Sequence, residues 1–229
     1  MKKQAIIFLD YNETFDDIAE GKGNVFIAAL RRFVRHFDGN VKIAVITSAL
    51  CNNNDLTIKE DLAFTLRYFP LQVREKFCCL IEENCKYMRD IKMDDGCAVF
   101  ENFRVLSLAN GTKKDGVERL LKHIDPKQEI DVCVFAGNSE KDDLIMIDAN
   151  VGNRDKYFLL ANRRVLKSEK YPVFKLSMQP EFKQFDFSHQ IVEELGQSKD
   201  IIIKTTNNSY GVGKGLEVVT NILEKERDK

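Results

Sequence analysis

The sequence predicts an open α/β fold, and three observations support this prediction. The chain has 229 residues, of which 44% are hydrophobic, and this is enough to bury a full core. Several apolar runs are continuous rather than alternating, which is typical of strands covered on both faces of a parallel sheet. Segments with the period of an amphipathic helix lie between them. We therefore expect a Rossmann-like parallel sheet with helices on both faces.

Four apolar runs are predicted to be strands, at residues 5–10, 41–49, 130–138 and 156–162. Each ends at a polar residue or a turn with glycine. The first stops at Asp10, the second contains Thr47, and the third ends at the turn of Gly137. Because the carboxyl ends of parallel strands form the ligand crevice of such sheets, we expect these positions to converge in space.

Three segments are predicted to be helices, at 26–37, 115–124 and 142–150. In the first of these, one face collects the apolar side chains Phe26, Leu30, Phe33, Val34 and Phe37. Such a face packs against the sheet. In the third, Asp142 and Asp143 are suited to a first helical turn, where the helix dipole favours acids.

The strands and helices predict a core domain made of residues 1–49 and 111–229. Residues 50–110 are predicted to be either a reduced inserted cap or additional helices and edge strands of the main sheet. Residues 163–195 are irregular and receive no assignment. The glycines of SYGVGKGL (209–216) are expected in a turn that opens the last helix.

Composition excludes several classes of partner. Lys plus Arg (35) nearly balances Asp plus Glu (36), so the chain has no overall basic field for nucleic acid. No apolar run approaches the roughly 18 to 20 residues that span a bilayer, so no membrane association is expected. The six cysteines include no CxxC pair, and we expect them to be reduced in a cytoplasmic protein.

The expected strand and helix ends supply a set of reactive groups. They are a carboxylate at Asp10, a hydroxyl at Thr47, an ammonium at Lys113 or Lys114, and carboxylates at Asp142 and Asp143. Phosphoryl transfer through an aspartyl intermediate needs a nucleophilic carboxylate, donors for the phosphoryl oxygens and acids that hold a metal ion. Oxygen ligands of this kind select Mg²⁺.

Four segments in order resemble the motifs of the haloacid dehalogenase superfamily of phosphatases. They are Asp10-Tyr11-Asn12-Glu13-Thr14, the strand containing Thr47, Gly-Thr-Lys-Lys-Asp-Gly (111–116) and Gly-Asn-Ser-Glu-Lys-Asp-Asp (137–143). The segment KTTNNSYGVGKGLEVVTNIL (204–223) is similar to the end of its Cof-type and mannosyl-3-phosphoglycerate phosphatase-like branch. The resemblance covers roughly half of the chain and implies an α/β core with a small cap.

The resemblance implies roles for Asp10, Asn12 and Thr47 in the first two motifs. Asp10 would be the nucleophile that forms the phosphoaspartate and also a Mg²⁺ ligand, and the backbone carbonyl of Asn12 would be a second ligand. Thr47 would donate its hydroxyl to the phosphoryl group. For two neighbouring residues the expectations come from their positions: Ser48 either helps to bind the phosphate or packs in the core, and Tyr11 shapes the entrance to the site.

A lysine is implied to neutralise charge on Asp10 and on the phosphoryl group. Lys113 is preferred, because the family's lysine stands three residues before a small residue, here Gly116. Lys114 is the alternative.

At the last motif, one acid is implied to bind Mg²⁺. Asp143 is preferred because Met146 then falls in the family's register, and Asp142 is the alternative. Asn138 occupies a further metal-site position that is usually acidic.

Two asparagines depart from the family pattern. Asn12 stands where active phosphatases of this type have an aspartate that protonates the leaving oxygen and then activates water, and Asn138 replaces the second acid. Loss of a general acid-base group costs about 100 to 10,000-fold in rate. Leaving groups that need no proton would be affected least.

Three functions follow from these patterns. The first is a Mg²⁺-dependent phosphatase of small phosphorylated metabolites, sugar phosphates among them. The second is a catalytically inactive protein that binds a phosphorylated ligand or has a regulatory role. The third is a phosphotransferase or phosphomutase, in which an acceptor other than water takes the phosphoryl group. Asn12 is compatible with each, and also with an exchange introduced to trap a complex.

Overall fold

The computed structural model describes residues 3–47, 62, 64–82, 89–90, 104–107, 111–162, 173–175, 200–206 and 208–227. Its strands are β1 (Ala5–Asp10), β2 (Val41–Thr47), β3 (Phe77–Glu82), β4 (Arg89–Asp90), β5 (Arg104–Ser107), β6 (Val132–Gly137), β7 (Asp155–Ala161), β8 (Val173–Lys175) and β9 (Asp200–Thr205). The helices are α1 (Asn24–His36), α3 (Leu71–Arg74), α4 (Lys113–Ile124) and α6 (Asn208–Arg227), with two 3₁₀ segments, η1 (Asp16–Glu20) and η2 (Leu144–Asp148).

The described strands form one sheet in the order β4-β5-β3-β2-β1-β6-β7-β9-β8. Every pairing is parallel except that of β4 with β5. The predicted Rossmann-like α/β class is therefore confirmed. The four predicted strands are present as β1, β2, β6 and β7, whereas β9 is a further strand that the sequence pattern had not separated from the tail.

The order of the strands reverses beside β1. From β1 the chain moves outward through β2 to β3, and it then returns through α4 to β6 on the other side of β1. In open α/β sheets the ligand crevice lies at such a switch point, outside the carboxyl ends of the strands. The topology therefore places the end of β1, at Asp10, beside the end of β6, at Gly137.

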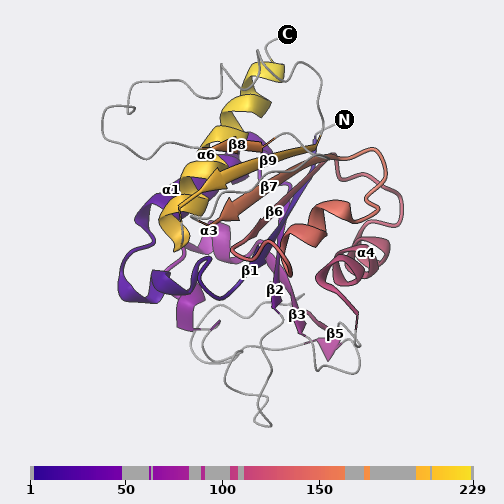
Figure 1. Ribbon diagram of the computed structural model, residues 1–229, viewed down its shortest axis with the longest axis horizontal. Helices are drawn as coiled ribbons and strands as arrows, with labels where there is room; N and C mark the ends of the chain where they lie inside the picture. The colour runs from indigo at the N-terminus through magenta and orange to yellow at the C-terminus, as the bar shows by residue number, and fades with distance from the viewer. Residues whose placement is uncertain are drawn as a thin grey trace.

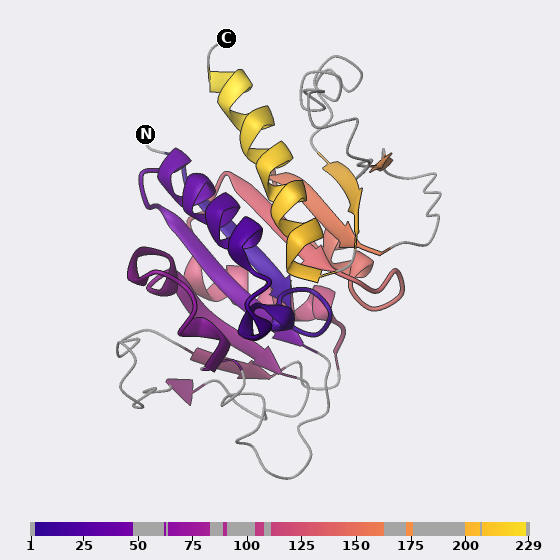
Figure 2. The ribbon, with the colours of Figure 1, turned by 90° about the vertical axis from the view of Figure 1, so that its left-hand side faces the viewer.

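Helices cover the two faces of the sheet. α1 and α6 lie side by side on one face, and α4 and η2 lie on the other (Figures 1 and 2). Because side chains alternate along a strand, Ile7 and Leu9 of β1 join the apolar cluster with α1 and α6, whereas Ile6 and Phe8 join the cluster with α4. This two-sided burial explains why the apolar runs in the sequence are continuous.

Part of the segment 50–110 extends the main sheet. α3 precedes β3, β3 pairs with β2, and β5 pairs with β3. These parts agree with the alternative of additional core elements. The predicted cap falls largely on 50–61, 83–88, 91–103 and 108–110, which lie outside the described residues, as does most of 163–195, of which the structure describes β8.

The predicted helix at 142–150 is shorter than expected. The structure has a five-residue 3₁₀ segment, η2, instead. The backbone N–H groups of Asp143 and Leu144 both bond to the carbonyl of Ser139, each at 3.1 Å, and the backbone turns to an extended conformation at Ala149. The loop before η2 and this extended residue after it leave room for one short turn.

The glycines of SYGVGKGL lie within α6, not in a turn before it. A Cβ atom at Gly213 would lie 2.7 Å from the backbone nitrogen of Phe26 in α1. A Cβ atom at Gly211 would lie 1.8 Å from the carbonyl oxygen of Thr206. These glycines therefore permit close backbone approach, which is a packing role that a turn prediction misses.

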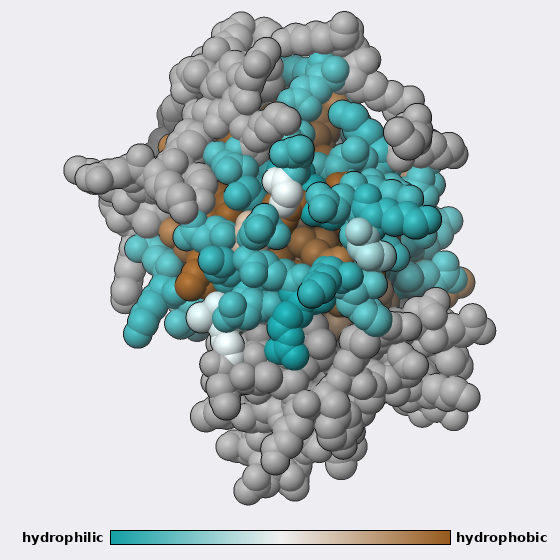
Figure 3. Space-filling model, turned by 90° about the vertical axis from the view of Figure 1, so that its right-hand side faces the viewer, coloured by the Kyte–Doolittle hydropathy of each residue, from teal (hydrophilic) through white to brown (hydrophobic). Residues whose placement is uncertain are grey.

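The surface on the α4 side is mainly hydrophilic in the described part of the chain. Figure 3 shows this side, with hydrophilic residues surrounding a smaller hydrophobic area. Of the described helices, none combines the length and the apolar character that a bilayer crossing requires.

Candidate active site

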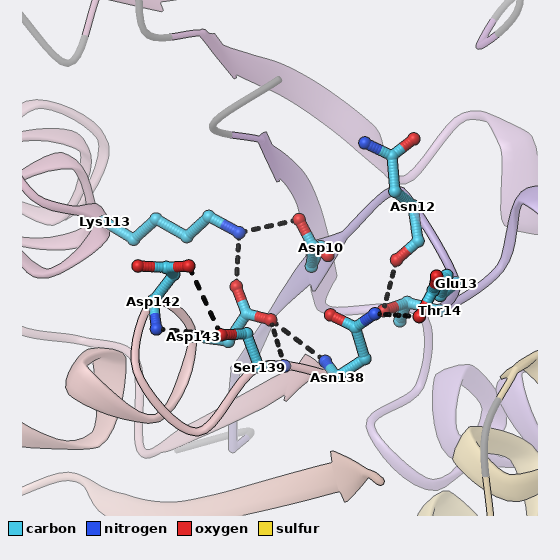
Figure 4. A network of polar contacts seen from close by, with 9 residues as sticks. All are labelled: Asp10, Asn12, Glu13, Thr14, Lys113, Asn138, Ser139, Asp142 and Asp143. Atoms are coloured by element: carbon cyan, nitrogen blue, oxygen red, sulfur yellow. Dashed lines mark hydrogen bonds and ion pairs between the residues drawn. The ribbon is translucent and has the colours of Figure 1, made fainter. Parts of the chain in front are cut away.

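A buried lysine joins two carboxylates at the carboxyl end of β1. Lys113 Nζ donates a hydrogen bond to Asp10 Oδ1 at 2.7 Å, and it also donates to Asp143 Oδ1. The exposed fractions are 5% for Asp10, 4% for Lys113 and 1% for Asp143. Figure 4 shows the three side chains converging from β1, α4 and the loop before η2. Residues from three of the four predicted motifs thus form one group.

The start of α4 fixes the position of Lys113. Thr112 is the N-cap of this helix: its side chain accepts from the backbone of Asp115, and the Asp115 carboxylate accepts from the backbone N–H of Thr112 at 2.6 Å. This reciprocal capping box defines the first helical residue, which is Lys113. Side chains alternate along a strand, so Asp10 lies on the same side of the sheet as Phe8, which is the side covered by α4. The side chains of Asp10 and Lys113 therefore face each other.

Lys114 is placed differently from Lys113. It is half-buried, and its charge acts on Asp115, whose pKa is lowered mainly by its hydrogen bonds to Thr112. The structure therefore brings Lys113, the preferred residue, to Asp10. Whether Lys113 acts in catalysis stays a prediction.

The loop after β6 wraps around Asp143. Asp143 Oδ2 accepts from the backbone N–H groups of Asn138 at 2.9 Å and Ser139 at 2.8 Å, which leaves Oδ1 for Lys113. A Cβ atom at Gly137 would lie 2.5 Å from the Cβ of Asp143, so a glycine is needed beneath this carboxylate. Asp142 is exposed instead, and its carboxylate accepts from Ser139 Oγ at 3.3 Å.

The group has one more negative charge than positive charge when both carboxyls are ionised. Burial raises the pKa of Asp10 to about 7, and Asp143 adds to this rise while Lys113 opposes it. Burial also opposes the charge on Lys113, but the two carboxylates outweigh it and raise the lysine pKa. Lys113 therefore stays positive, and Asp10 is the member that takes up a proton in the absence of another cation.

The oxygens around this group are of the type that Mg²⁺ prefers. Within the described residues, no three or more His, Cys, Asp or Glu side chains are grouped as a metal site. Mg²⁺ does not need such a cage, because it keeps several water ligands and takes one or two carboxylates. Two buried carboxylates with a single ammonium leave an excess of negative charge, which suits a cation that takes oxygen ligands. That the carbonyl of Asn12 joins them as a ligand stays a prediction.

The side chain of Asn12 is turned away from Lys113 and Asp143. Its backbone carbonyl accepts from Thr14 Oγ1 at 3.3 Å, and the residue is exposed. Figure 4 shows this orientation of the side-chain amide. An amide cannot exchange a proton in the way that a carboxyl can, so this position offers no acid or base.

The remaining residues predicted for the site are Thr47, Tyr11 and Ser48. Thr47 is fully buried at the end of β2, one residue beyond Ile46, which pairs with Asp10. Tyr11 is buried among core aromatic residues, and its hydroxyl shares a hydrogen bond of 3.0 Å with Thr65 Oγ1. Its substrate-binding role stays a prediction, and Ser48 lies outside the described residues.

Asn138 has contacts that the sequence did not reveal. Its side-chain Nδ2 donates to Glu13 Oε2 at 2.7 Å, and its carbonyl accepts from Asn162 Nδ2 at 2.7 Å. The structure therefore turns the Asn138 amide toward Glu13, whereas its backbone N–H bonds to Asp143. Asn162 could have been found, because it directly follows β7 at the same edge. Nothing in the sequence pattern points to Glu13.

Searches of protein-family models, of curated proteins and of solved structures found no match to this chain. The fold and the site together define a Rossmann-like α/β protein with a buried Asp–Lys–Asp group at the switch point of its sheet.

Proposed function

We propose that the protein is a Mg²⁺-dependent phosphatase that hydrolyses small phosphorylated metabolites, sugar phosphates among them, through a phosphoaspartyl intermediate on Asp10. One observation supports this most directly: Lys113 bonds to both Asp10 and Asp143, so three predicted motifs meet at one buried point. A buried carboxylate beside an ammonium, at the crevice of an α/β sheet, suits a nucleophile that must be held rigidly. The resemblance to the haloacid dehalogenase superfamily supplies the reaction type.

The proposed reaction has two steps. A carboxylate oxygen of Asp10 attacks phosphorus, and the bond from phosphorus to the leaving oxygen breaks with its electron pair going to that oxygen. Water then attacks the phosphoaspartate, so that phosphate leaves and the carboxylate is restored. Lys113 offsets the negative charge of Asp10 in both steps, and Thr47 donates a hydrogen bond to the phosphoryl oxygens.

The proposal assigns a Mg²⁺ ion to the oxygens of Asp10, Asp143 and the carbonyl of Asn12, with Asp142 and Asn138 as the alternative positions. When bound, this ion supplies positive charge against the phosphoryl oxygens. The Asp10–Lys113–Asp143 group has one uncompensated negative charge when both carboxyls are ionised. This supports the assignment, because the burial of an uncompensated charge is costly.

Asn12 predicts the substrate preference within this reaction. No acid at position 12 protonates the leaving oxygen, so acyl and aryl phosphates, whose leaving groups are stable anions, should react faster than alkyl phosphates. Acetyl phosphate and p-nitrophenyl phosphate are the suitable first substrates.

The test measures phosphate release from both substrates with Mg²⁺ and with a chelator. We expect Mg²⁺-dependent turnover that Asp10→Asn abolishes, with Glu217→Gln on α6, whose carboxylate pairs with Lys214, as a control that retains it. We also expect Asn12→Asp to raise the rate on alkyl phosphates by about 100-fold or more. Turnover that survives in Asp10→Asn would exclude the phosphoaspartyl route.

The inactive, ligand-binding alternative is favoured by Asn12 and Asn138 together, because neither amide can act as an acid or a base. Binding of phosphate or a sugar phosphate without turnover, in a form that Lys113→Met abolishes, would support it. Substrate consumption that exceeds phosphate release would instead indicate phosphoryl transfer to an added acceptor, as in a phosphomutase.

A cytoplasmic location belongs to the same proposal. Cys133, one of the described cysteines, is a thiol buried in β6. Reduced cysteines are typical of proteins in reducing compartments. A phosphatase of small metabolites would meet its substrates there.

A further inference from the structure

Glu13 has a backbone conformation that is unusual for its residue type. Its φ is +55°, in the left-handed region that glycine adopts freely and that other residues rarely adopt. The position is three residues after the end of β1, between Asn12 and Thr14. A turn of this shape would be formed most easily by glycine, so the retention of a glutamate requires a reason in its side chain.

The Glu13 side chain has a specific partner. Its Oε2 accepts from Asn138 Nδ2 at 2.7 Å, which joins the loop after β1 to the loop after β6 (Figure 4). The backbone carbonyl of Glu13 also accepts from the N–H of Asn208 at the start of α6, at 3.1 Å. Both ends of the residue are therefore held.

Asn138 extends this connection to the buried group. Its backbone N–H donates to Asp143 Oδ2 at 2.9 Å, and its carbonyl accepts from Asn162 at the end of β7. A change at Glu13 therefore reaches Asp143 through one intervening residue. Asp143 in turn bonds to Lys113, which bonds to Asp10.

We propose that Glu13 and Asn138 form a clamp between the two loops and that Glu13 is a positioning residue for Asp143, acting through Asn138. The inference rests on the proposed function, in which Asp143 binds Mg²⁺. It also gives a physical reason for Asn138. A carboxylate at position 138 would face the Glu13 carboxylate across a hydrogen-bond distance, so the two positions carry one acid and one amide as a matched pair.

Two explanations of Asn138 make opposite predictions for the Asn138→Asp variant. One is that Asn138 replaces an acid of the metal site, and the other is that it forms the clamp with Glu13. If Asn138 were merely a lost metal-site acid, restoring the carboxylate should strengthen Mg²⁺ binding. If the clamp exists, the same change places two negative charges together and displaces the Asp143 loop. Mg²⁺ binding should then weaken about 10-fold or more, as is common for residues that orient a metal ligand.

The experiment is a double-mutant cycle with Asn138→Asp, Glu13→Gln and the double variant. The readouts are the thermal unfolding midpoint without Mg²⁺ and the Mg²⁺ concentration that gives half of the maximal shift. Glu13→Gln should stay within about 3-fold of the parent, because the new amide oxygen still accepts from Asn138. The double variant should recover most of the Mg²⁺ affinity that Asn138→Asp loses, since an amide at position 13 can donate to a carboxylate at position 138.

Glu13→Gly separates positioning from stability. Glycine relieves the left-handed backbone, so the unfolding midpoint without Mg²⁺ should stay or rise, whereas the half-saturating Mg²⁺ concentration should increase about 10-fold. Glu217→Gln, which removes a carboxylate that pairs with Lys214 on α6, is the matched control and should change neither readout.

The outcomes decide each claim separately. Mg²⁺ binding that improves in Asn138→Asp, or a double variant no better than that single one, would overturn the clamp. If Mg²⁺ shifts no midpoint even in the parent protein, the metal assignment in the proposed function fails. The midpoints without Mg²⁺ then still judge the clamp, because the cycle must show coupling between positions 13 and 138.

Discussion

Lys113 holds two buried carboxylates with a single ammonium group, so its removal should affect folding as well as chemistry. Lys113→Met would leave Asp10 and Asp143 facing each other without a cation. We expect a loss of about 3 kcal/mol in the free energy of unfolding at pH 8, measured by urea denaturation in a chelator. The loss should be smaller at pH 5, where one carboxyl takes up a proton.

Lys114→Met is the control for this prediction. Lys114 is half-buried beside Lys113, and its charge acts on Asp115, which is also half-buried. Its replacement should change stability by less than about 0.5 kcal/mol. Equal losses in the two variants would mean that the Asp10–Lys113–Asp143 contacts do not determine stability.

Asp10 should give the metal-free protein a characteristic pH dependence. Burial raises its pKa to about 7 in the folded state, from 3.8 in the unfolded chain. Between these values the folded state keeps a proton that the unfolded chain has released. The contribution of Asp10 to stability is therefore complete below the lower pKa and is lost as the pH rises through the higher one.

Asp10→Asn removes this titration and should stabilise the metal-free protein at pH 8. The measurement is the difference in free energy of unfolding between variant and parent, from urea curves in a chelator at pH 5 and pH 8. We expect the difference to grow with pH in favour of the variant. A difference that does not change with pH would show that Asp10 titrates normally in the folded protein.

At the scale of the elements, the packing of α6 on α1 depends on Gly213. In an exposed helix, glycine to alanine usually stabilises by about 1 kcal/mol. Here the new Cβ would lie 2.7 Å from the backbone nitrogen of Phe26, which cannot rotate away. Gly213→Ala should therefore destabilise the protein by about 1 to 3 kcal/mol in urea denaturation.

Lys214→Ala is the neighbouring control for α6. Lys214 is partly exposed and pairs with Glu217, so its loss should cost less than about 0.5 kcal/mol. A gain of stability in Gly213→Ala would contradict the close approach of the two helices.

The elements show which features of a sequence report the fold. β1 and β6 are predictable because burial on both faces of the sheet requires apolar residues at successive positions. η2 is not, because Leu144 to Ile147 is too short a run to distinguish a helix from one 3₁₀ turn. The glycines of α6 are misread for a related reason: a glycine that opens a turn and one that admits a neighbouring helix look alike without the partner.

The site follows the same division. Asp10 could be predicted because it is the charged residue that ends a continuous apolar strand. The preference for Lys113 over Lys114 and for Asp143 over Asp142 came instead from the motif register of the family that the sequence resembles. Glu13 could not be predicted, since its role depends on a contact with Asn138 across 125 positions of the chain. The local sequence pattern indicates which side chains belong to the site, whereas their contacts with residues far along the chain are known only from the structure.

At the scale of the whole molecule, the topology concentrates charge at one point. The order of the strands reverses beside β1, so the carboxyl ends of β1 and β6 lie together at the switch point, and α4 begins there with Lys113 as its first residue. The core beneath this point is apolar on both faces of the sheet. Any imbalance of charge is therefore poorly solvated and should couple to the stability of the whole fold.

This coupling predicts a pH-dependent stabilisation by Mg²⁺. A ligand that binds the folded state alone at 100 times its dissociation constant stabilises by about 2.7 kcal/mol. If Mg²⁺ binds at Asp10 and Asp143, saturating Mg²⁺ should raise the thermal unfolding midpoint clearly at pH 8. The shift should be smaller at pH 5.5, because the proton on Asp10 competes with the ion below a pKa of about 7.

Calorimetric scans with Mg²⁺, and with a chelator, measure this effect at both pH values. In Asp10→Asn, Mg²⁺ should raise the unfolding midpoint much less than in the parent, and the midpoint in the chelator should be higher than that of the parent. The same carboxylate causes both effects. Asp142→Asn should keep the parent's response, because Asp142 is exposed and bonds to Ser139. A Mg²⁺ shift equal at the two pH values, and retained in Asp10→Asn, would place the ion elsewhere and separate the metal from the buried group at the switch point.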